Sequence, residues 1–256
     1  MRQLLLLVVF IVTVVNAAAS AAAPPQLSRV VFGSGQAINI EQEYDGAEEG
    51  SVLWDASRTL LAHVAHARES GIDEISGKRL LEIGSGTGAV GLALACMGAK
   101  SVILTDKASQ LPLMRRNLRH NQPESGTGRG GSSVLAPVSI HCLPWGAQWQ
   151  SEADASLSAA DAFDTIVCCD CVYPDRPSGL ATVLLDLLAL NPRSTMLLAF
   201  ERRPPPADAP PGTDHTRDFF EVMRAGCDVE RVADAELDPH WACDEISLWR
   251  MRARTC

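Results

Sequence analysis

The sequence is poor in aromatic residues and carries no excess of positive charge. Aromatic side chains make up 5% of its 256 residues, and the formal net charge is −9 at pH 7. A nucleic-acid surface needs a basic stripe that neutralises phosphates, so this charge balance argues against a nucleic-acid partner. We expect the partner to be a small molecule or another protein, in particular a basic segment of one.

The chain also lacks the cysteine and histidine spacings of disulfide-stapled domains and metal sites. Three of its eight cysteines, Cys168, Cys169 and Cys171, crowd one short stretch, and no second ligand pair follows at zinc-finger spacing. None of the six histidines shows ligand spacing, and His63 and His66 share one helix face, which we expect to be solvated. The sequence therefore predicts reduced thiols and no metal.

An apolar run long enough to cross a membrane comfortably is missing as well. Arg2 precedes the apolar residues 4–15, and a small-residue tract with several A-x-A sites follows at 17–23. This layout is typical of a secretory signal peptide. An uncleaved anchor that extends through the alanines and a start codon placed too far upstream are the alternatives. We divide the chain into a leader (1–23), an N-terminal extension (24–44) and one globular domain (45–256).

From residue 50 onward, helical and strand periodicities alternate. We expect helices over 53–65, 89–97, 111–121, 180–190 and around 219–220, and strands over 80–83, 102–106, 138–143, 163–169, 195–200, 227–232 and 246–251. This alternation predicts an α/β fold with a doubly wound parallel sheet, in which ligands bind at the carboxyl ends of the strands.

Three alternating glycines follow the first of these strands. Gly84, Gly86 and Gly88 lie between the strand and the apolar helix over 89–97. Alternating glycines let the backbone turn sharply and approach a ligand without Cβ clashes, and the helix N-terminus offers unpaired N–H donors. Asp106 ends the next strand about twenty residues on, where a carboxylate takes both ribose hydroxyls. The pattern predicts a nucleotide-type ligand.

Two classes of cofactor share such a loop. Residues 84–89 also fit the dinucleotide pattern, which leaves a nicotinamide or flavin cofactor open, and a merely structural turn is a further alternative. We favour S-adenosylmethionine because the glycines alternate strictly. Glu82, two residues before the first glycine, also faces the cofactor end of the strand.

A second chemical motif follows the fourth strand. Asp170 and Tyr173 come directly after residues 163–169, and the first and fourth strands of a doubly wound sheet flank the point where ligands bind. An acid and a phenol at this point can act on an incoming amine. The alternative is structural, with Asp170 as a helix cap and Tyr173 as a packed ring. Phe200-Glu201-Arg202, at the end of strand five, either lines the acceptor channel or forms a surface ion pair.

Five motifs in one order carry a resemblance to a known family. They are Val52–Ala56, Glu82–Gly88, Asn117-x-x-x-Asn121, Trp145-Gly146 and Asp170-x-x-Tyr173. Over residues 45–252 the chain resembles the seven-β-strand protein-lysine methyltransferases, which modify chaperones, elongation factors and similar proteins. The resemblance implies a Rossmann-like seven-stranded sheet, mostly parallel with an antiparallel last strand. It also implies S-adenosylmethionine as cofactor and a protein substrate, such as a chaperone or translation factor.

The resemblance further implies which residues line the cofactor site. They are Trp54, Gly84, Ser85, Gly86, Asp106, Trp145 and Cys169, and the loop pattern adds Glu82 and Gly88. We expect Asp106 to bind the ribose, Trp145 to lie flat against the adenine and Trp54 to close the pocket. The chain departs from the family at Pro144, where an Asp is common, and at Cys169, where a small Ala or Gly is usual. The first change weakens a polar cofactor contact and the second alters the pocket volume.

The expected reaction is methyl transfer to a lysine ε-amine of a protein. Asp170 accepts a hydrogen bond from the amine, and Tyr173 binds the ammonium through its ring or hydroxyl. A methyltransferase for arginine, histidine or a small molecule and a noncatalytic cofactor-binding interaction protein are the alternatives. We expect a monomer that meets a membrane only through an uncleaved leader. Localisation stays open, because the cofactor is made in the cytosol whereas the leader points to the secretory pathway or a membrane.

Overall fold

The computed structural model describes residues 26–33, 35–44, 48–122, 135–146, 148–154, 163–173, 177–205 and 207–254. The predicted leader (1–23) and the glycine-rich stretch 123–131 lie outside these ranges. Within the described ranges, no helix is long and apolar enough to span a membrane. No group of three His, Cys, Asp or Glu residues there is placed to hold a metal ion.

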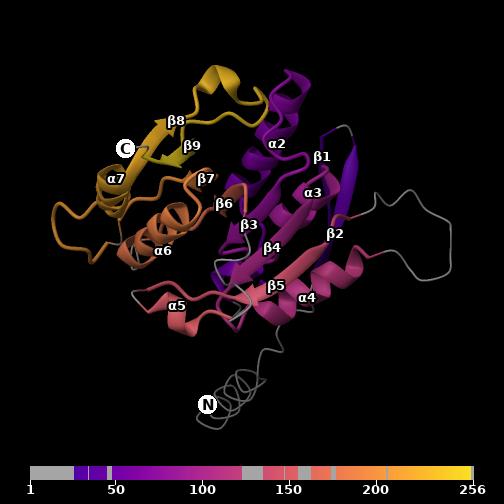
Figure 1. The fold of residues 1–256 in the computed structure, drawn as a ribbon, viewed down its shortest axis with the longest axis horizontal. Coiled ribbons are helices and arrows are strands. Elements are labelled where there is room, and N and C mark those ends of the chain that lie inside the picture. The colour runs from indigo at the N-terminus through magenta and orange to yellow at the C-terminus, as the bar shows by residue number, and fades with distance from the viewer. Residues whose placement is uncertain are drawn as a thin grey trace, which may run out of the picture.

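A seven-stranded sheet forms the centre of the fold (Figure 1). Its strands are β3 (Arg79–Ile83), β4 (Ser101–Asp106), β5 (Val138–Cys142), β6 (Thr165–Cys169), β7 (Thr195–Glu201), β8 (Cys227–Arg231) and β9 (Ile246–Ala253). They lie in the order β5-β4-β3-β6-β7-β9-β8, and β9 runs antiparallel to both of its neighbours while the other pairs are parallel. The predicted fold is confirmed, and every predicted strand agrees with the observed one to within two residues at either end.

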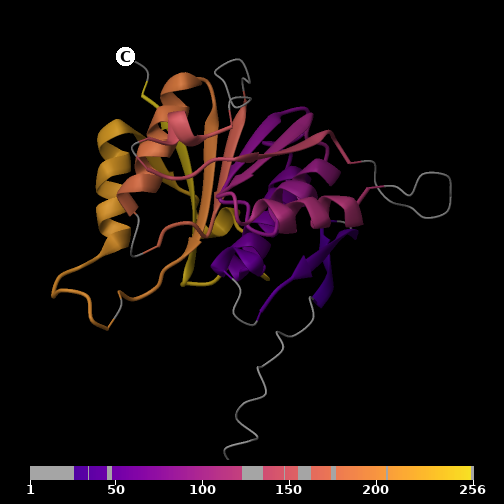
Figure 2. The same cartoon turned by 90° about the horizontal axis from the view of Figure 1, so that it is seen from below.

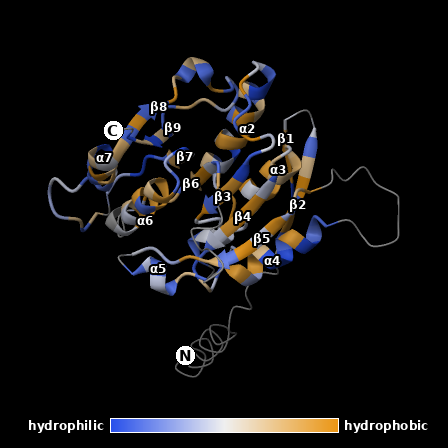
Figure 3. Cartoon of the chain, viewed as in Figure 1, coloured by the Kyte–Doolittle hydropathy of each residue, from blue (hydrophilic) through white to orange (hydrophobic). Residues whose placement is uncertain are grey.

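Two layers of helices cover the sheet (Figure 2). One layer holds α2 (Asp55–Glu69), α3 (Ala89–Cys96) and α4 (Leu111–His120), and the other holds α5 (Trp149–Glu152), α6 (Pro177–Leu190) and α7 (His215–Gly226). Hydrophobic residues concentrate along the central strands and on α3 and α6 (Figure 3). Because neighbouring strand residues point to opposite faces, Cys168 packs into the α6 layer and Cys169 into the α3 layer.

A hairpin of β1 (Gln26–Phe32) and β2 (Gln36–Gln42) packs against the layer of α2, α3 and α4. It lies in the segment 24–44, to which the sequence analysis assigned no structure. Val30, Ile38 and Ile40 are buried in the same hydrophobic cluster as α3. The hairpin is therefore part of the packed fold.

Asn117 of α4 and Asn121, which caps the C-terminus of this helix, bind the backbone of β2. Asn117 accepts the N–H of Glu41 at 2.7 Å and donates to the Glu41 carbonyl at 3.1 Å. Asn121 makes the same two bonds with Asn39, at 2.8 Å each. Residues four apart on a helix share a face, and so do residues two apart on a strand. The two side-chain amides therefore pair with successive N–H and C=O groups on the free edge of β2. Asn117 also donates to the carbonyl of Thr87 at 2.9 Å, which ties the hairpin to the glycine loop.

The expected solvation of His63 is wrong. Its side chain is fully buried, and Nδ1 lies 3.2 Å from the carbonyl oxygen of Glu236 in the short 3₁₀ helix η2 (Asp234–Glu236). Nε2 lies 3.4 Å from the guanidinium of Arg250. Burial lowers the pKa of His63, with Arg250 as a second cause, so the ring stays neutral. Residues around Glu236 and Arg250 cover His63 on α2. Helical spacing does not reveal such a contact, because these residues lie far along the chain.

We expect Asn117→Ala to lower the free energy of unfolding by about 2–3 kcal/mol, because it leaves the partly buried N–H and carbonyl of Glu41 and the buried carbonyl of Thr87 unpaired. Asn121→Ala, whose partner Asn39 is exposed, should cost about 1 kcal/mol. Urea unfolding measures both. If both variants lost the same free energy of unfolding, Asn117 would not be the main connection between the hairpin and the glycine loop.

Candidate active site

The glycine loop after β3 is fastened to the end of β4. Ser85 donates its N–H to the Thr105 carbonyl at 2.9 Å, and Thr105 donates its N–H to Ser85 Oγ at 3.1 Å. Gly86 donates its N–H to Asp106 Oδ2 at 2.8 Å. The Ser85 hydroxyl also lies 3.4 Å from the Glu82 carbonyl. The Ser85 hydroxyl and N–H are thus both engaged by the protein itself, so Ser85 fixes the shape of the loop.

Two of the three loop glycines approach other residues too closely for a side chain. Gly84 and Gly86 have φ of +65° and +54°. A Cβ at Gly84 would lie 2.5 Å from Cys171 Sγ, and one at Gly86 would lie 2.6 Å from the Gly50 carbonyl oxygen. Gly88 instead precedes α3 with φ of +77°, so it shapes the start of this helix.

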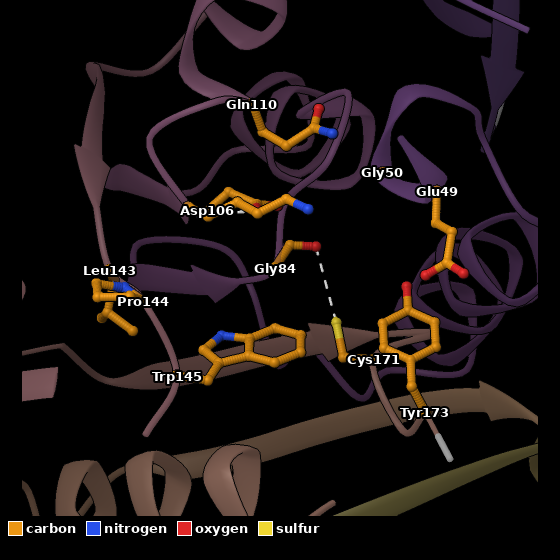
Figure 4. A pocket seen from close by; sticks show the side chains of 11 residues that line it. Glu49, Gly50, Gly84, Asp106, Gln110, Leu143, Pro144, Trp145, Cys171 and Tyr173 are labelled. Carbon is orange, nitrogen blue, oxygen red and sulfur yellow. Dashed lines mark hydrogen bonds between the residues drawn. The ribbon is translucent and has the colours of Figure 1, made fainter. Parts of the chain in front are cut away.

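A cavity of about 220 Å³ opens between the glycine loop and the segment after β5 (Figure 4). It is lined by Glu49, Gly50, Gly84, Asp106, Lys107, Gln110, Leu143, Pro144, Trp145, Cys171 and Tyr173. A second cavity of about 30 Å³ shares Gly50, Gly84 and Tyr173 with the first. Its lining also includes the predicted residues Trp54, Glu82, Ser85, Gly86 and Cys169. Of the predicted site residues, Gly88 and Asp170 line neither cavity.

The larger cavity has the groups that a nucleoside requires. Each oxygen of Asp106 accepts one backbone N–H, from Gly86 at 2.8 Å and from Lys107 at 2.7 Å. A carboxylate has about four acceptor sites, so two remain for ribose hydroxyls. Burial raises the pKa of Asp106. The Trp145 ring lines the same cavity and offers a flat apolar surface to a base. The residues present therefore fit the nucleoside of S-adenosylmethionine.

Tyr173 lies where the two cavities meet. Its ring is stacked with Trp145 at 6.5 Å between ring centroids. Burial raises the pKa of Tyr173, so its hydroxyl stays a neutral donor. Figure 4 shows this hydroxyl and the Glu49 carboxylate pointing toward one another. Glu49 is exposed, and it was not among the predicted site residues. Its backbone carbonyl accepts a hydrogen bond from Trp54 Nε1 at 3.0 Å.

Asp170 is buried and already paired. It is 2% exposed, and its φ of +55° is the one positive value at a non-glycine residue within the described ranges. Arg203 donates to its two carboxylate oxygens at 2.8 and 2.7 Å, and the Glu201 N–H donates to Oδ1 at 3.2 Å. Arg203 also donates to Glu201 Oε2 at 2.9 Å and lies 5.2 Å from the centroid of the Trp54 ring.

The residues at the end of β7 and just after it have three different surroundings. Glu201 and Arg203 face Asp170, whereas Phe200 is buried in the core. Arg202 forms a separate ion pair with Asp214 at 3.6 Å. Arg203 was not among the residues 200–202 predicted near the acceptor channel. It lies two residues after Glu201, so the alternation of β7 places both side chains on one face.

Glu82 is buried beneath the loop. It accepts the N–H of Gly91 at 2.9 Å, which links β3 to α3. Burial raises the pKa of Glu82 to about 8, so the side chain is mostly protonated at neutral pH. Burial likewise raises the pKa of Cys169, which remains a thiol at the wall of the smaller cavity.

We expect the protein to lose stability relative to its Glu82→Gln variant as pH rises from about 5 to 9. The folded pKa of Glu82 is raised from 4.5 to about 8, so its contribution is complete below 4.5 and is lost as pH passes through 8. The difference should reach roughly 4 kcal/mol. Urea unfolding at pH 5, 7 and 9 measures it, and a pH-independent difference would contradict the raised pKa.

Gly86→Ala should weaken binding of S-adenosylmethionine by about ten-fold or more, because the new Cβ meets the Gly50 carbonyl oxygen and strains the left-handed backbone. Calorimetric titration measures this affinity. Gly71→Ala is the matched control, since Gly71 also has positive φ but has open space around it. An equal loss in both variants would show that backbone strain alone is responsible.

Comparison with known proteins agrees with this geometry. A family model described as lysine methyltransferase matches residues 34–225. Protein N-lysine methyltransferase METTL21A of Xenopus tropicalis is 27% identical over 204 residues, which cover 79% of this chain and 80% of the relative. Protein-lysine N-methyltransferase EFM6 of Saccharomyces cerevisiae is 26% identical over 229 residues, with 81% and 83% covered.

A solved structure shares the fold. The T. thermophilus 16S rRNA methyltransferase RsmC, in complex with AdoMet and guanosine, is similar with a TM-score of 0.55 and 16% identity. The similarity covers 93% of this chain, which spans about half (53%) of that one. At this identity the likeness establishes the class I methyltransferase fold alone. Together with the family match, it shows that this chain belongs to the lysine methyltransferase family and is an S-adenosylmethionine-dependent protein-lysine methyltransferase.

Proposed function

We propose that Asp170 and Tyr173 form the acceptor side of the site and that the substrate is a chaperone or a translation factor. The observation that carries the first part is the position of Tyr173, which lines both cavities beside the Glu49 carboxylate. Asp170 lies three residues before Tyr173, and its charge is, after burial and Cys171, a further cause of the raised pKa of the phenol. An aromatic ring near carboxylates suits a lysine ammonium.

The proposed mechanism relies on positioning. The cofactor supplies a methyl group that is already activated on a sulfonium. A lysine amine with a pKa of ~10.4 is neutral in on the order of one molecule in a thousand near pH 7. The carboxylates attract the ammonium, the Tyr173 ring and hydroxyl hold it, and the buried surroundings favour its neutral form. Glu49 is exposed, so it offers a proton acceptor in contact with solvent.

On the cofactor side we assign Trp54, Glu82, Gly84, Ser85, Gly86, Asp106, Trp145 and Cys169. Asp106 would hold the ribose and Trp145 the adenine, while the smaller cavity beside Trp54 would take the methionine end. We assign Gly88 the structural role of starting α3, where its N–H donates to the Ser85 carbonyl.

A basic segment of a protein is the proposed partner surface. The net charge of −9 and the carboxylates Glu49, Asp170 and Glu201 near the acceptor side favour a cationic segment over an acidic one. The names of METTL21A and EFM6 as protein-lysine methyltransferases support a protein substrate. The narrower choice of a chaperone or translation factor is supported by the five-motif resemblance.

The test is to incubate the full-length chain with radiolabelled S-adenosylmethionine and a cytosolic extract. We expect one or a few labelled bands that mass spectrometry assigns to lysine, and that Gly86→Ala weakens. Label on arginine or histidine, or on small molecules only, would overturn the lysine assignment. Cofactor binding without any label would indicate a noncatalytic role.

Asp170→Asn and Tyr173→Phe should each lower turnover by about ten-fold or more while changing cofactor affinity less than two-fold, because both residues act on the acceptor amine. Single-turnover kinetics and calorimetry separate the two quantities. If both variants methylate at the normal rate, neither residue belongs to the mechanism.

A further inference from the structure

The Asp170–Arg203 pair places a cation where the proposed acceptor cation has to bind. The Arg203 guanidinium donates one hydrogen bond to each oxygen of Asp170, at 2.8 and 2.7 Å. Its carbon lies 5.2 Å from the centroid of the Trp54 ring. A carboxylate and an aromatic face are also the groups that bind a lysine ammonium. Arg203 therefore already fills a cation site of the protein.

Asp170 cannot bind a second cation while Arg203 stays in place. Asp170 and Glu201 contribute two negative charges and Arg203 one positive charge, so the cluster attracts a cation but offers it no open oxygen of Asp170. An ammonium that entered beside Arg203 would meet a like charge at contact distance. Both oxygens of Asp170 are engaged, and the residue is 2% exposed, so no part of this carboxylate is open to an amine while Arg203 stays in place.

Arg203 is placed so that it can leave. About 29% of its side chain is exposed, against 2% for Asp170. It follows the end of β7, and residues 202–205 belong to no helix or strand. The guanidinium can thus swing outward without breaking backbone bonds of the sheet. Arg203 is therefore a movable cation that competes with an incoming ammonium for the fixed Asp170 carboxylate.

We propose that Arg203 determines acceptor specificity by occupying the ammonium site until the target lysine displaces it from Asp170 and Trp54. The inference rests on the proposed acceptor role of Asp170. Displacement breaks two charged hydrogen bonds, so a small amine gains too little to replace Arg203. A lysine on a protein brings additional contacts that offset this cost, which selects protein lysines over free amines.

The test measures binding of n-butylammonium, the side-chain equivalent of lysine, to full-length protein loaded with S-adenosylhomocysteine. Calorimetry should show about ten-fold or tighter binding to Arg203→Met than to the unchanged protein, because no charged hydrogen bonds have to be broken. Met retains an apolar chain over Trp54. Arg202→Met is the matched control, since Arg202 pairs with Asp214 outside the cluster, and its affinity should change less than two-fold. Adding Asp170→Asn to Arg203→Met should remove the gain.

Arg203→Lys guards against a folding defect, because it keeps the positive charge but cannot bond both oxygens in the arginine geometry. Circular dichroism checks the fold of each variant, and we expect the Lys variant to show an intermediate gain. Unchanged or weaker binding in the folded variants would overturn the proposal and make Arg203 part of the cation site itself. No methyl transfer is needed for this measurement, so failure of the extract assay would count against the proposed function alone.

Discussion

The attachment of the glycine loop to the end of β4 is the constraint on which the rest of the site depends. Ser85 and Thr105 exchange hydrogen bonds, and Gly86 bonds the Asp106 side chain. These bonds fix where the loop turns, and they orient the Asp106 carboxylate at the wall of the larger cavity. They also hold Gly86 against the Gly50 carbonyl, which explains why a side chain has no room there.

The hairpin extends this constraint to the N-terminal part of the fold. Its edge strand β2 is paired by side-chain amides of α4, and the same amide of Asn117 reaches the Thr87 carbonyl in the glycine loop. An edge strand exposes N–H and C=O groups that need partners. Here those partners come from a helix that packs beside the site, so the position of the hairpin and the position of the loop are coupled through one buried residue.

Local patterns were sufficient to predict the sheet, because its strands are marked by short apolar runs. On the proposed cofactor side, the loop glycines and Asp106 could be placed at strand ends from spacing, whereas Trp54, Trp145 and Cys169 rested on the family resemblance. The proposed acceptor side and the docking of the hairpin depend on contacts between distant segments. Arg203 is 33 residues from Asp170, and Asn117 is 76 residues from Glu41. Burial of His63 by the segment around Glu236 is of the same kind. In β2, by contrast, Ile38 and Ile40 are both buried and alternate with polar neighbours, so a usable signal was present.

Asp106 and Asp170 differ in how the protein uses their carboxylates, and this difference separates the proposed cofactor side from the proposed acceptor side. Asp106 is oriented by backbone N–H groups, which carry no net charge and leave acceptor sites open on both oxygens. Asp170 is oriented by a guanidinium, which balances its charge and covers it. The Asp106 side is thus already open to the groups that it is proposed to bind. On the proposed acceptor side, the Asp170–Arg203 ion pair has to open first, so we expect discrimination between acceptors at Arg203. This residue is far from the glycine loop in sequence, and its hydrogen bonds go to Asp170 and Glu201 and not to the loop.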